Sequence, residues 1–264
     1  MTVDEKTKAG DAAGLDLPTY DDVARAHERI KPYIHETPVQ TCTTMNTLSG
    51  AELFFKCENF QKAGAFKVRG ATNAVFGLSD AQAEKGVATH SSGNHALSLS
   101  YAGGRRGIPV HVVMPHSAPK AKKDAVRGYG GQITECEPST SSREAVFQTV
   151  QERTGADFVH PYNDPRIIAG QGTCAKEMLS QIEGLDAVIA PIGGGGMVSG
   201  TCLTLAALAP HIEIYAAEPE AADDAYRSFK SGSLIQDDAP QTIADGLKVP
   251  MKEYTWHFVR NYVT

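Results

Sequence analysis

Apolar and polar positions along the chain alternate between two kinds of segment. Short apolar runs of strand length are separated by longer stretches whose apolar residues have helical spacing. The predicted strands are Leu53–Lys56, Val87–His90, Val110–Met114, Ile133–Cys136, Ala187–Ile192 and Ile212–Ala216. Strands that alternate with helices in this way are typical of an α/β protein, in which a parallel sheet is covered by helices on both faces.

The same alternation predicts two structural units. The stretch 77–163 has its own succession of strands and helices, and no low-complexity linker separates it from its flanks. We therefore expect a second, smaller α/β domain at 77–163, inserted into a larger discontinuous domain formed by 1–76 and 164–264. A helix should follow Thr19 and run through Ile30, because Thr19 and Asp22 have the spacing of a capping box.

The segment from Ala187 to Pro210 contains no charged residue and is long enough to cross a bilayer. It is interrupted, however, by Pro191, by four consecutive glycines and by hydroxyl side chains. We therefore interpret it as a buried strand, a loop and a buried helix, and we expect no membrane association.

Composition excludes several functional classes. Of the 264 residues, 41% are hydrophobic and 21% are charged, and the formal net charge is −6, as in an ordinary folded globular protein. Lys and Arg are dispersed, and the densest groups are more typical of solvated faces than of a phosphate-binding surface. These groups are Lys120 with Lys122 and Lys123, and the pair Arg105 and Arg106. We expect no nucleic-acid partner.

The cysteines and the N-terminus indicate the cellular compartment in which the protein is located. The five cysteines are odd in number, widely spaced and free of any CxxC pair, which argues against a disulfide framework or a zinc site. Residues 1–14 are polar and of mixed charge, unlike a secretory signal or a transit peptide, and we expect a disordered lead-in. A reducing, cytoplasmic location follows.

Candidate chemistry lies in three loops, each between a predicted strand and a predicted helix, where open parallel sheets bind ligands. In the first, Lys67 stands near a helix start between Phe66 and Val68, surroundings that would desolvate an amine and lower its pKa. Such a lysine forms a Schiff base or acts as a general base. By itself, a surface lysine in a first helical turn explains the pattern equally well.

The second loop is Ser91-Ser92-Gly93-Asn94-His95, which opens a helix. Main-chain N–H groups and hydroxyls at a helix N-terminus suit a carboxylate or a phosphate. An N-capping residue without a ligand, and a histidine that is simply buried, remain alternatives.

The third loop contains Gly193 to Gly196 between a buried strand and a helix. Four glycines let the backbone approach an anion closely, whereas a tight turn needs only one or two. The loop is neither a Walker A motif nor a G-x-G-x-x-G fingerprint, because no Gly-Lys-Ser/Thr follows and Met197 or Val198 takes a glycine place. Nicotinamide binding stays open, since Glu218 lies about twenty residues further on.

Together these motifs resemble a known family. The segments Gly64 to Ala71, Ser91 to His95 and Gly193 to Gly196, in this order, resemble the fold-type II enzymes that depend on pyridoxal 5'-phosphate (PLP). Ile168 to Thr173 and Thr242 to Gly246 resemble the branch that contains serine racemase and the serine/threonine dehydratases. The resemblance runs from about Tyr20 to the last residue. It implies a PLP-dependent dehydratase (ammonia-lyase), an amino-acid racemase, or both, acting on small hydroxy amino acids.

The resemblance also implies residue roles. Lys67 would be the Schiff-base lysine and a base on one face of the substrate Cα, and Ser92 would be the acid/base on the other face. The cofactor-binding residues would be Phe66, Lys67, Asn94, Gly193, Gly194, Gly195, Gly196 and Gly246. The substrate-binding residues would be Ser91, Ser92, Asn94, His95 and Arg143. The resemblance further implies a homodimer.

A divalent-cation site is implied at Glu218, Ala222 and Asp224, where two carboxylates and a carbonyl suit Mg²⁺ or Ca²⁺. The alternative is a helix N-terminus that carries acidic residues. ATP activation is known in the racemase, but no motif for it is recognisable here.

Two departures from the family pattern stand out. Ala65 replaces the serine usual before Phe-Lys, and the chain ends at Thr264 without the family's C-terminal Ser/Thr-Gly-Gly-Asn stretch. The second departure supports an alternative, a non-catalytic, truncated PLP-binding fragment.

Overall fold

The computed structural model describes residues 14–236 and 240–264. The predicted N-terminal lead-in, apart from Gly14, lies outside the described residues. The α-helices are α1 (Tyr20–Ile30), α2 (Thr43–Ser49), α3 (Lys67–Phe76), α4 (Asp80–Lys85), α5 (Asn94–Arg106), α6 (Lys120–Gly128), α7 (Thr140–Thr154), α8 (Pro165–Gln181), α9 (Gly196–Leu208), α10 (Asp224–Ser231) and α11 (Glu253–Tyr262). The strands are β1 (Val39–Thr41), β2 (Phe54–Lys56), β3 (Val87–His90), β4 (Val110–Pro115), β5 (Gln132–Cys136), β6 (Asp157–Phe158), β7 (Ala187–Pro191) and β8 (Glu213–Ala217).

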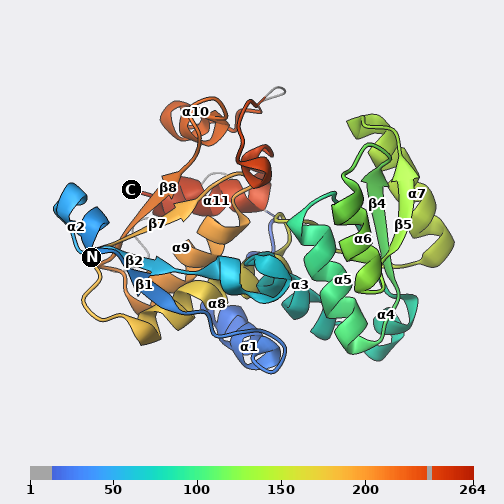
Figure 1. The fold of residues 1–264 in the computed structure, drawn as a ribbon, viewed down its shortest axis with the longest axis horizontal. Coiled ribbons are helices and arrows are strands. Elements are labelled where there is room, and N and C mark those ends of the chain that lie inside the picture. Colours follow the sequence, from blue (N-terminus) through green and yellow to red (C-terminus); the bar gives the residue numbers. More distant parts are fainter. Residues whose placement is uncertain (1–13, 237–239) are drawn as a thin grey trace.

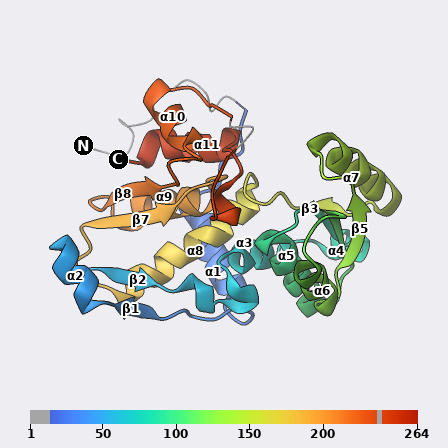
Figure 2. The same cartoon turned by 45° about the horizontal axis from the view of Figure 1, so that its top comes forward.

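A four-stranded parallel sheet has the order β5-β4-β3-β6. The apolar run in β4 buries Val110, Val112, Val113 and Met114, as expected of an interior parallel strand whose two faces are covered. Figure 1 and Figure 2 show this sheet and helices α4 to α7 as one lobe of the molecule. All of these elements lie inside the predicted segment 77–163; the domain boundaries themselves stay a prediction.

The other lobe contains the parallel pair β7-β8, connected through α9, and its core joins Ile192 and Leu205 to Met251 and Phe258. The uncharged segment after Ala187 forms a strand, a loop and a helix, as predicted. No helix in the described part of the chain is long and apolar enough to cross a membrane.

The α/β class is confirmed, as is the capping-box helix, which begins at Tyr20 after Thr19 and ends at Ile30. One expectation was wrong: the strand predicted at Leu53–Lys56 does not join a parallel sheet. It pairs antiparallel with β1, with Gln40 opposite Phe55. The chain returns from β1 through the short helix α2, and β2 runs back beside β1 in the opposite direction.

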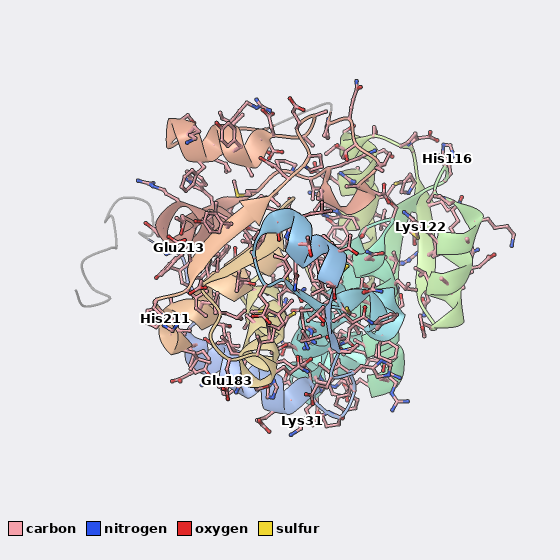
Figure 3. The ribbon with its side chains drawn as sticks, turned by 60° about the vertical axis from the view of Figure 1, so that its left-hand side comes forward. Lys31, His116, Lys122, Glu183, His211 and Glu213 are labelled. Atoms are coloured by element: carbon pink, nitrogen blue, oxygen red, sulfur yellow. The ribbon has the colours of Figure 1, made fainter. Side chains whose placement is uncertain are left out.

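The basic group of three lysines is paired with carboxylates. Lys120, Lys122 and Lys123 pair with Asp124, Asp245 and Glu135 at 2.5, 2.5 and 2.8 Å. Lys31 and Lys122, labelled in Figure 3, lie on widely separated parts of the surface.

Candidate active site

Lys67 is the first residue of α3, and it is half-buried. Its Nζ donates a hydrogen bond to the carbonyl oxygen of Pro161 at 2.8 Å and lies 5.3 Å from the ring centroid of Phe66 and 6.0 Å from that of Tyr162. Burial lowers the pKa of Lys67 from 10.5 to about 8. Roughly a fifth of this amine is therefore neutral at about pH 7.4, far more than for an ordinary lysine, which makes it available as a nucleophile or a base.

Helix α3 is held by a buried ionic network that begins two residues after Lys67. Arg69 is 0% exposed and donates to both oxygens of Glu58 at 2.7 and 2.8 Å and to both oxygens of Glu177 at 3.0 and 3.1 Å. Lys56 also donates to Glu177, at 2.5 Å. Burial acts to raise the pKa of Glu177, but the hydrogen bonds from Arg69 and Lys56 hold it below its ordinary value. The network thus fixes helix α3, whose first residue is Lys67.

The serine-containing loop joins β3 to α5, which begins at Asn94. Ser91 and Ser92 are half-buried, Asn94 is exposed, and the main-chain N–H of Gly93 donates to Ser91 Oγ at 3.3 Å. The first-turn N–H groups of a helix have no acceptor within the helix, so this loop presents several donors. The arrangement suits a carboxylate at the N-terminus of α5.

His95 lies deep in the same site, close enough to Lys67 for the lysine charge to act on it. Burial, followed by the charge of Lys67, lowers the pKa of His95 to about 3, so the ring is neutral. Its Nε2 lies 3.0 Å from the carbonyl oxygen of Val159 and must donate there, which leaves Nδ1 as an acceptor with no partner in the described part of the protein. The ring therefore cannot donate to a carboxylate, and the predicted substrate role of His95 depends on its main-chain N–H.

The four glycines form a buried turn at the start of α9. Gly195 has φ +84°, in the left-handed region that favours glycine, and Gly196 is the first helical residue. A Cβ on Gly194 would lie 2.4 to 2.6 Å from three atoms of the Tyr162 ring. Because Tyr162 also lies beside the Lys67 amine, the first and third candidate loops meet at this one side chain.

Gly246 lies on the other side of the turn. A Cβ on Gly193 would lie 2.8 Å from Leu247 Cα and 3.1 Å from the Gly246 carbonyl oxygen. The structure therefore brings Gly246 beside the glycines, although they are about fifty residues apart in sequence.

Arg143 lies in the first turns of α7 and faces the same region. Burial lowers the pKa of His90, and the charge of Arg143 lowers it further; the same charge acts on Tyr162. Within the described residues, Nε of Arg143 is buried and has no hydrogen-bond partner. The Nε–H donor of Arg143 is therefore left available for a hydrogen bond.

The acidic loop predicted to bind a cation connects β8 to α10. The Glu218 carboxylate accepts hydrogen bonds from the main-chain N–H groups of Ala225 and Tyr226 at 3.3 and 2.6 Å, so it caps α10. Burial raises its pKa, and the nearby charges of Asp224 and Asp223 raise it further. Residues 14–236 and 240–264 contain no cluster of three or more His, Cys, Asp or Glu side chains arranged for a metal. The predicted set contributes only two such side chains, together with the Ala222 carbonyl.

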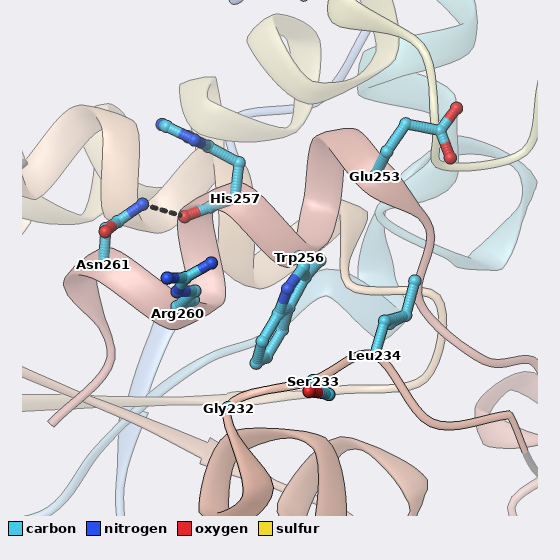
Figure 4. A pocket seen from close by; sticks show the side chains of 8 residues that line it. All are labelled: Gly232, Ser233, Leu234, Glu253, Trp256, His257, Arg260 and Asn261. Atoms are coloured by element: carbon cyan, nitrogen blue, oxygen red, sulfur yellow. Dashed lines mark hydrogen bonds between the residues drawn. The ribbon is translucent and has the colours of Figure 1, made fainter. Parts of the chain in front are cut away.

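A pocket of about 350 Å³ lies between α11 and the turn after α10, with Trp256 and His257 on one side and Leu234 on the other (Figure 4). None of the predicted site residues lines it.

Tyr162, Arg69 and Lys252 were not identified from the sequence. Arg69 left a signal, since a charged residue sits in the otherwise apolar and small-residue segment after Lys67. Tyr162 and Lys252 could not be recognised from local pattern, because Tyr162 lies beside Lys67 from a distant segment and Lys252 acts by its charge on His90 and His160 from another.

Comparison with known proteins identifies the family of this chain. A family model described as "Pyridoxal-phosphate dependent enzyme" matches residues 30–264. The chain is 72% identical over 248 residues to a beta-hydroxyaspartate dehydratase of Paracoccus denitrificans, covering 94% of this chain and 79% of that protein.

Two solved structures are also similar. Maize serine racemase has a TM-score of 0.92 at 48% identity, covering 94% of this chain and 75% of that one. A bacterial threonine deaminase, described as that of T.th., has a TM-score of 0.88 at 39% identity, covering 93% and 80%.

Proposed function

Because this chain belongs to the pyridoxal-phosphate dependent enzyme family, we propose that it is a dehydratase (ammonia-lyase), a racemase, or both, acting on small hydroxy amino acids through Lys67. One observation carries the proposal. The Lys67 amine has a pKa of about 8 and shares the neighbour Tyr162 with a glycine turn from which side chains are absent. A reactive amine beside an anion-binding turn is what PLP, an aldehyde with a phosphate, requires.

The residues of the site fit PLP. The main-chain N–H groups of Gly193 to Gly196 would hold its phosphate at the positive end of the α9 dipole. Phe66 would flank the ring, Asn94 would bind the ring hydroxyl, and Gly246 would lie close beside it. When bound, PLP withdraws electron density from the substrate Cα and so makes its proton removable.

The protein's own groups would then handle that proton. Lys67 would remove it on one face of Cα, and the Ser92 hydroxyl would supply or accept one on the other face. The loop from Ser91 to His95 would bind the substrate carboxylate through hydroxyl and main-chain donors, with Arg143 as a further anchor. Loss of the β-hydroxyl as water leaves an enamine, which water then hydrolyses to a keto acid and ammonia. Return of a proton from Ser92 would instead give the opposite enantiomer.

The substrate class follows from the relatives. Those compared are named for β-hydroxyaspartate, serine and threonine, all of which carry a hydroxyl at Cβ. We propose the same three as substrates here, with 3-hydroxyaspartate favoured by the 72% identity.

Further parts of the proposal concern ions, assembly and location. We propose that Glu218, Asp224 and the Ala222 carbonyl bind Mg²⁺ or Ca²⁺, since burial and then the charges of Asp224 and Asp223 raise the pKa of Glu218, and a cation would offset both effects. Activation by ATP, a homodimer and a cytoplasmic location are also proposed, on the resemblance alone.

The test is a comparison of Lys67→Ala with the nearby control Lys62→Ala. Wild-type protein and Lys62→Ala should develop the visible absorbance of lysine-bound PLP and should release ammonia from L-serine or 3-hydroxyaspartate. Lys67→Ala should do neither, and turnover by this variant would refute the role of the lysine. Absorbance without turnover in the wild type would instead support the alternative of a non-catalytic PLP-binding fragment.

A further inference from the structure

Two cationic side chains approach the site from different elements. Arg143 extends from α7, and Phe147, one turn further along that helix, packs edge-on against His90 with ring centroids 5.2 Å apart. Lys252 is the N-cap of α11. The charges of Arg143 and Lys252 both act on the His90 ring, and that of Lys252 also acts on His160. The two cations therefore face one region of space.

The start of α11 is fixed directly to the site. Asn163 donates to Glu253 Oε1 at 3.0 Å and accepts from the main-chain N–H of Tyr254 at 3.1 Å. The main-chain N–H of Lys252 donates to Thr255 Oγ1 at 3.2 Å, and a Cβ on Gly195 would lie 2.8 Å from Thr255 Cβ. Lys252 thus emerges between the glycine turn and the segment that carries Pro161 and Tyr162, the neighbours of Lys67.

Neither Arg143 nor Lys252 forms a salt bridge within residues 14–236 and 240–264. Glu253, the residue that follows Lys252, accepts a hydrogen bond from Asn163 instead. Lys252 is exposed, so its long side chain is free to turn towards an anion at the mouth of the site. A pair of cations that lacks carboxylate partners favours a ligand that carries more than one negative charge.

We propose that Lys252 is a specificity-determining residue that binds the second carboxylate of a dicarboxylic substrate such as 3-hydroxyaspartate, while the Ser91 to His95 loop binds the first. This inference rests on the proposed function. It adds to that proposal the residue that would favour a dicarboxylic substrate over serine or threonine. Serine and threonine have no second carboxylate, so the contact with Lys252 raises the affinity for the dicarboxylic substrate selectively.

The test uses binding as well as turnover. Succinate, a dicarboxylate without amine or hydroxyl, and propionate, its monocarboxylate counterpart, are titrated calorimetrically into PLP-treated wild-type protein, Lys252→Met and the control Lys248→Met, an exposed lysine of the same segment. Lys252→Met should weaken succinate binding about tenfold, with propionate affinity unchanged, and Lys248→Met should change neither. The kcat/KM ratio of 3-hydroxyaspartate to L-serine should fall by a similar factor in Lys252→Met alone.

Equal succinate affinities of wild type and Lys252→Met would overturn the inference, as would parallel losses for succinate and propionate. Its failure is separable from that of the proposed function. The wild-type protein could bind succinate more tightly than propionate, and lose this preference in Lys252→Met, yet show neither PLP absorbance nor turnover. That result would refute the enzymatic proposal and still support an anion-binding role for Lys252.

Discussion

Replacement of Arg69 by Met tests how the helix that carries Lys67 is held. Methionine keeps much of the apolar length of arginine but removes the charge and all the donors. Glu58 and Glu177, whose side chains are 11% and 6% exposed, would then lose their shared partner, and Lys56 would remain beside Glu177. Removal of one partner from a buried ionic network costs about 3–5 kcal/mol, because the remaining charges stay buried without compensation. We expect the free energy of unfolding at pH 7 to fall by about this amount.

The assay is urea unfolding of the cofactor-free protein, followed by far-UV circular dichroism. Arg25→Met is the matched control, since Arg25 pairs with Asp22 at the surface, with side chains 61% and 38% exposed, and should cost less than about 1 kcal/mol. Adding Glu58→Gln to Arg69→Met should recover part of the loss, because it removes one uncompensated charge. A cost for Arg69→Met no larger than that for Arg25→Met would refute the reasoning.

The loss should also depend on pH. The pKa of Glu177 is lower in the folded protein than its ordinary value of 4.5, so its ionic contacts stabilise the protein above that value and are lost as the pH falls through the folded pKa. The difference in the free energy of unfolding between wild type and Arg69→Met should therefore become smaller below pH 4.5. A difference that grows towards acid pH would contradict the assignment.

Two further predictions concern the site itself. Gly194→Ala should weaken PLP binding about tenfold in an absorbance titration, because the added methyl group overpacks the turn by about 1–3 kcal/mol and displaces the Tyr162 ring. The control Gly128→Ala, whose Cβ would meet open space, should leave the affinity for PLP unchanged. Equal affinities of the two variants would contradict the close contact at the turn. The rate at which cofactor-free protein takes up PLP should rise with pH around a midpoint of about 8, as the Lys67 amine loses its proton. The rate for a free lysine derivative, measured alongside, should still be rising above that pH, and a protein midpoint near 10.5 would refute the effect of burial.

Much of the candidate site was recognisable in the sequence because its parts are local. The start of α3 at Lys67, the start of α5 at Asn94 and the glycine turn before α9 depend on residues only a few positions apart. The resemblance added Gly246, which the fold places beside Gly193. The roles of these residues stay predictions until they are tested.

Other features could not be predicted from local patterns. The neutral state of the His95 ring depends on burial and on Lys67, and the tautomer depends on the carbonyl of Val159, 64 residues away. The partners of Arg69 come from segments 11 and 108 residues distant. Spacing along the chain carries no information about such contacts.

The sequence by itself determined the α/β class, the position of most strands and the three loops that carry the chemistry, because hydrophobic periodicity, glycine and helix capping act over a few residues. Only the tertiary structure decided that β1 and β2 pair antiparallel, that Arg69 is buried between two carboxylates, and that Tyr162 lies beside Lys67. The physical reason is that desolvation and charge interactions depend on distance in space, which the packing of remote segments sets.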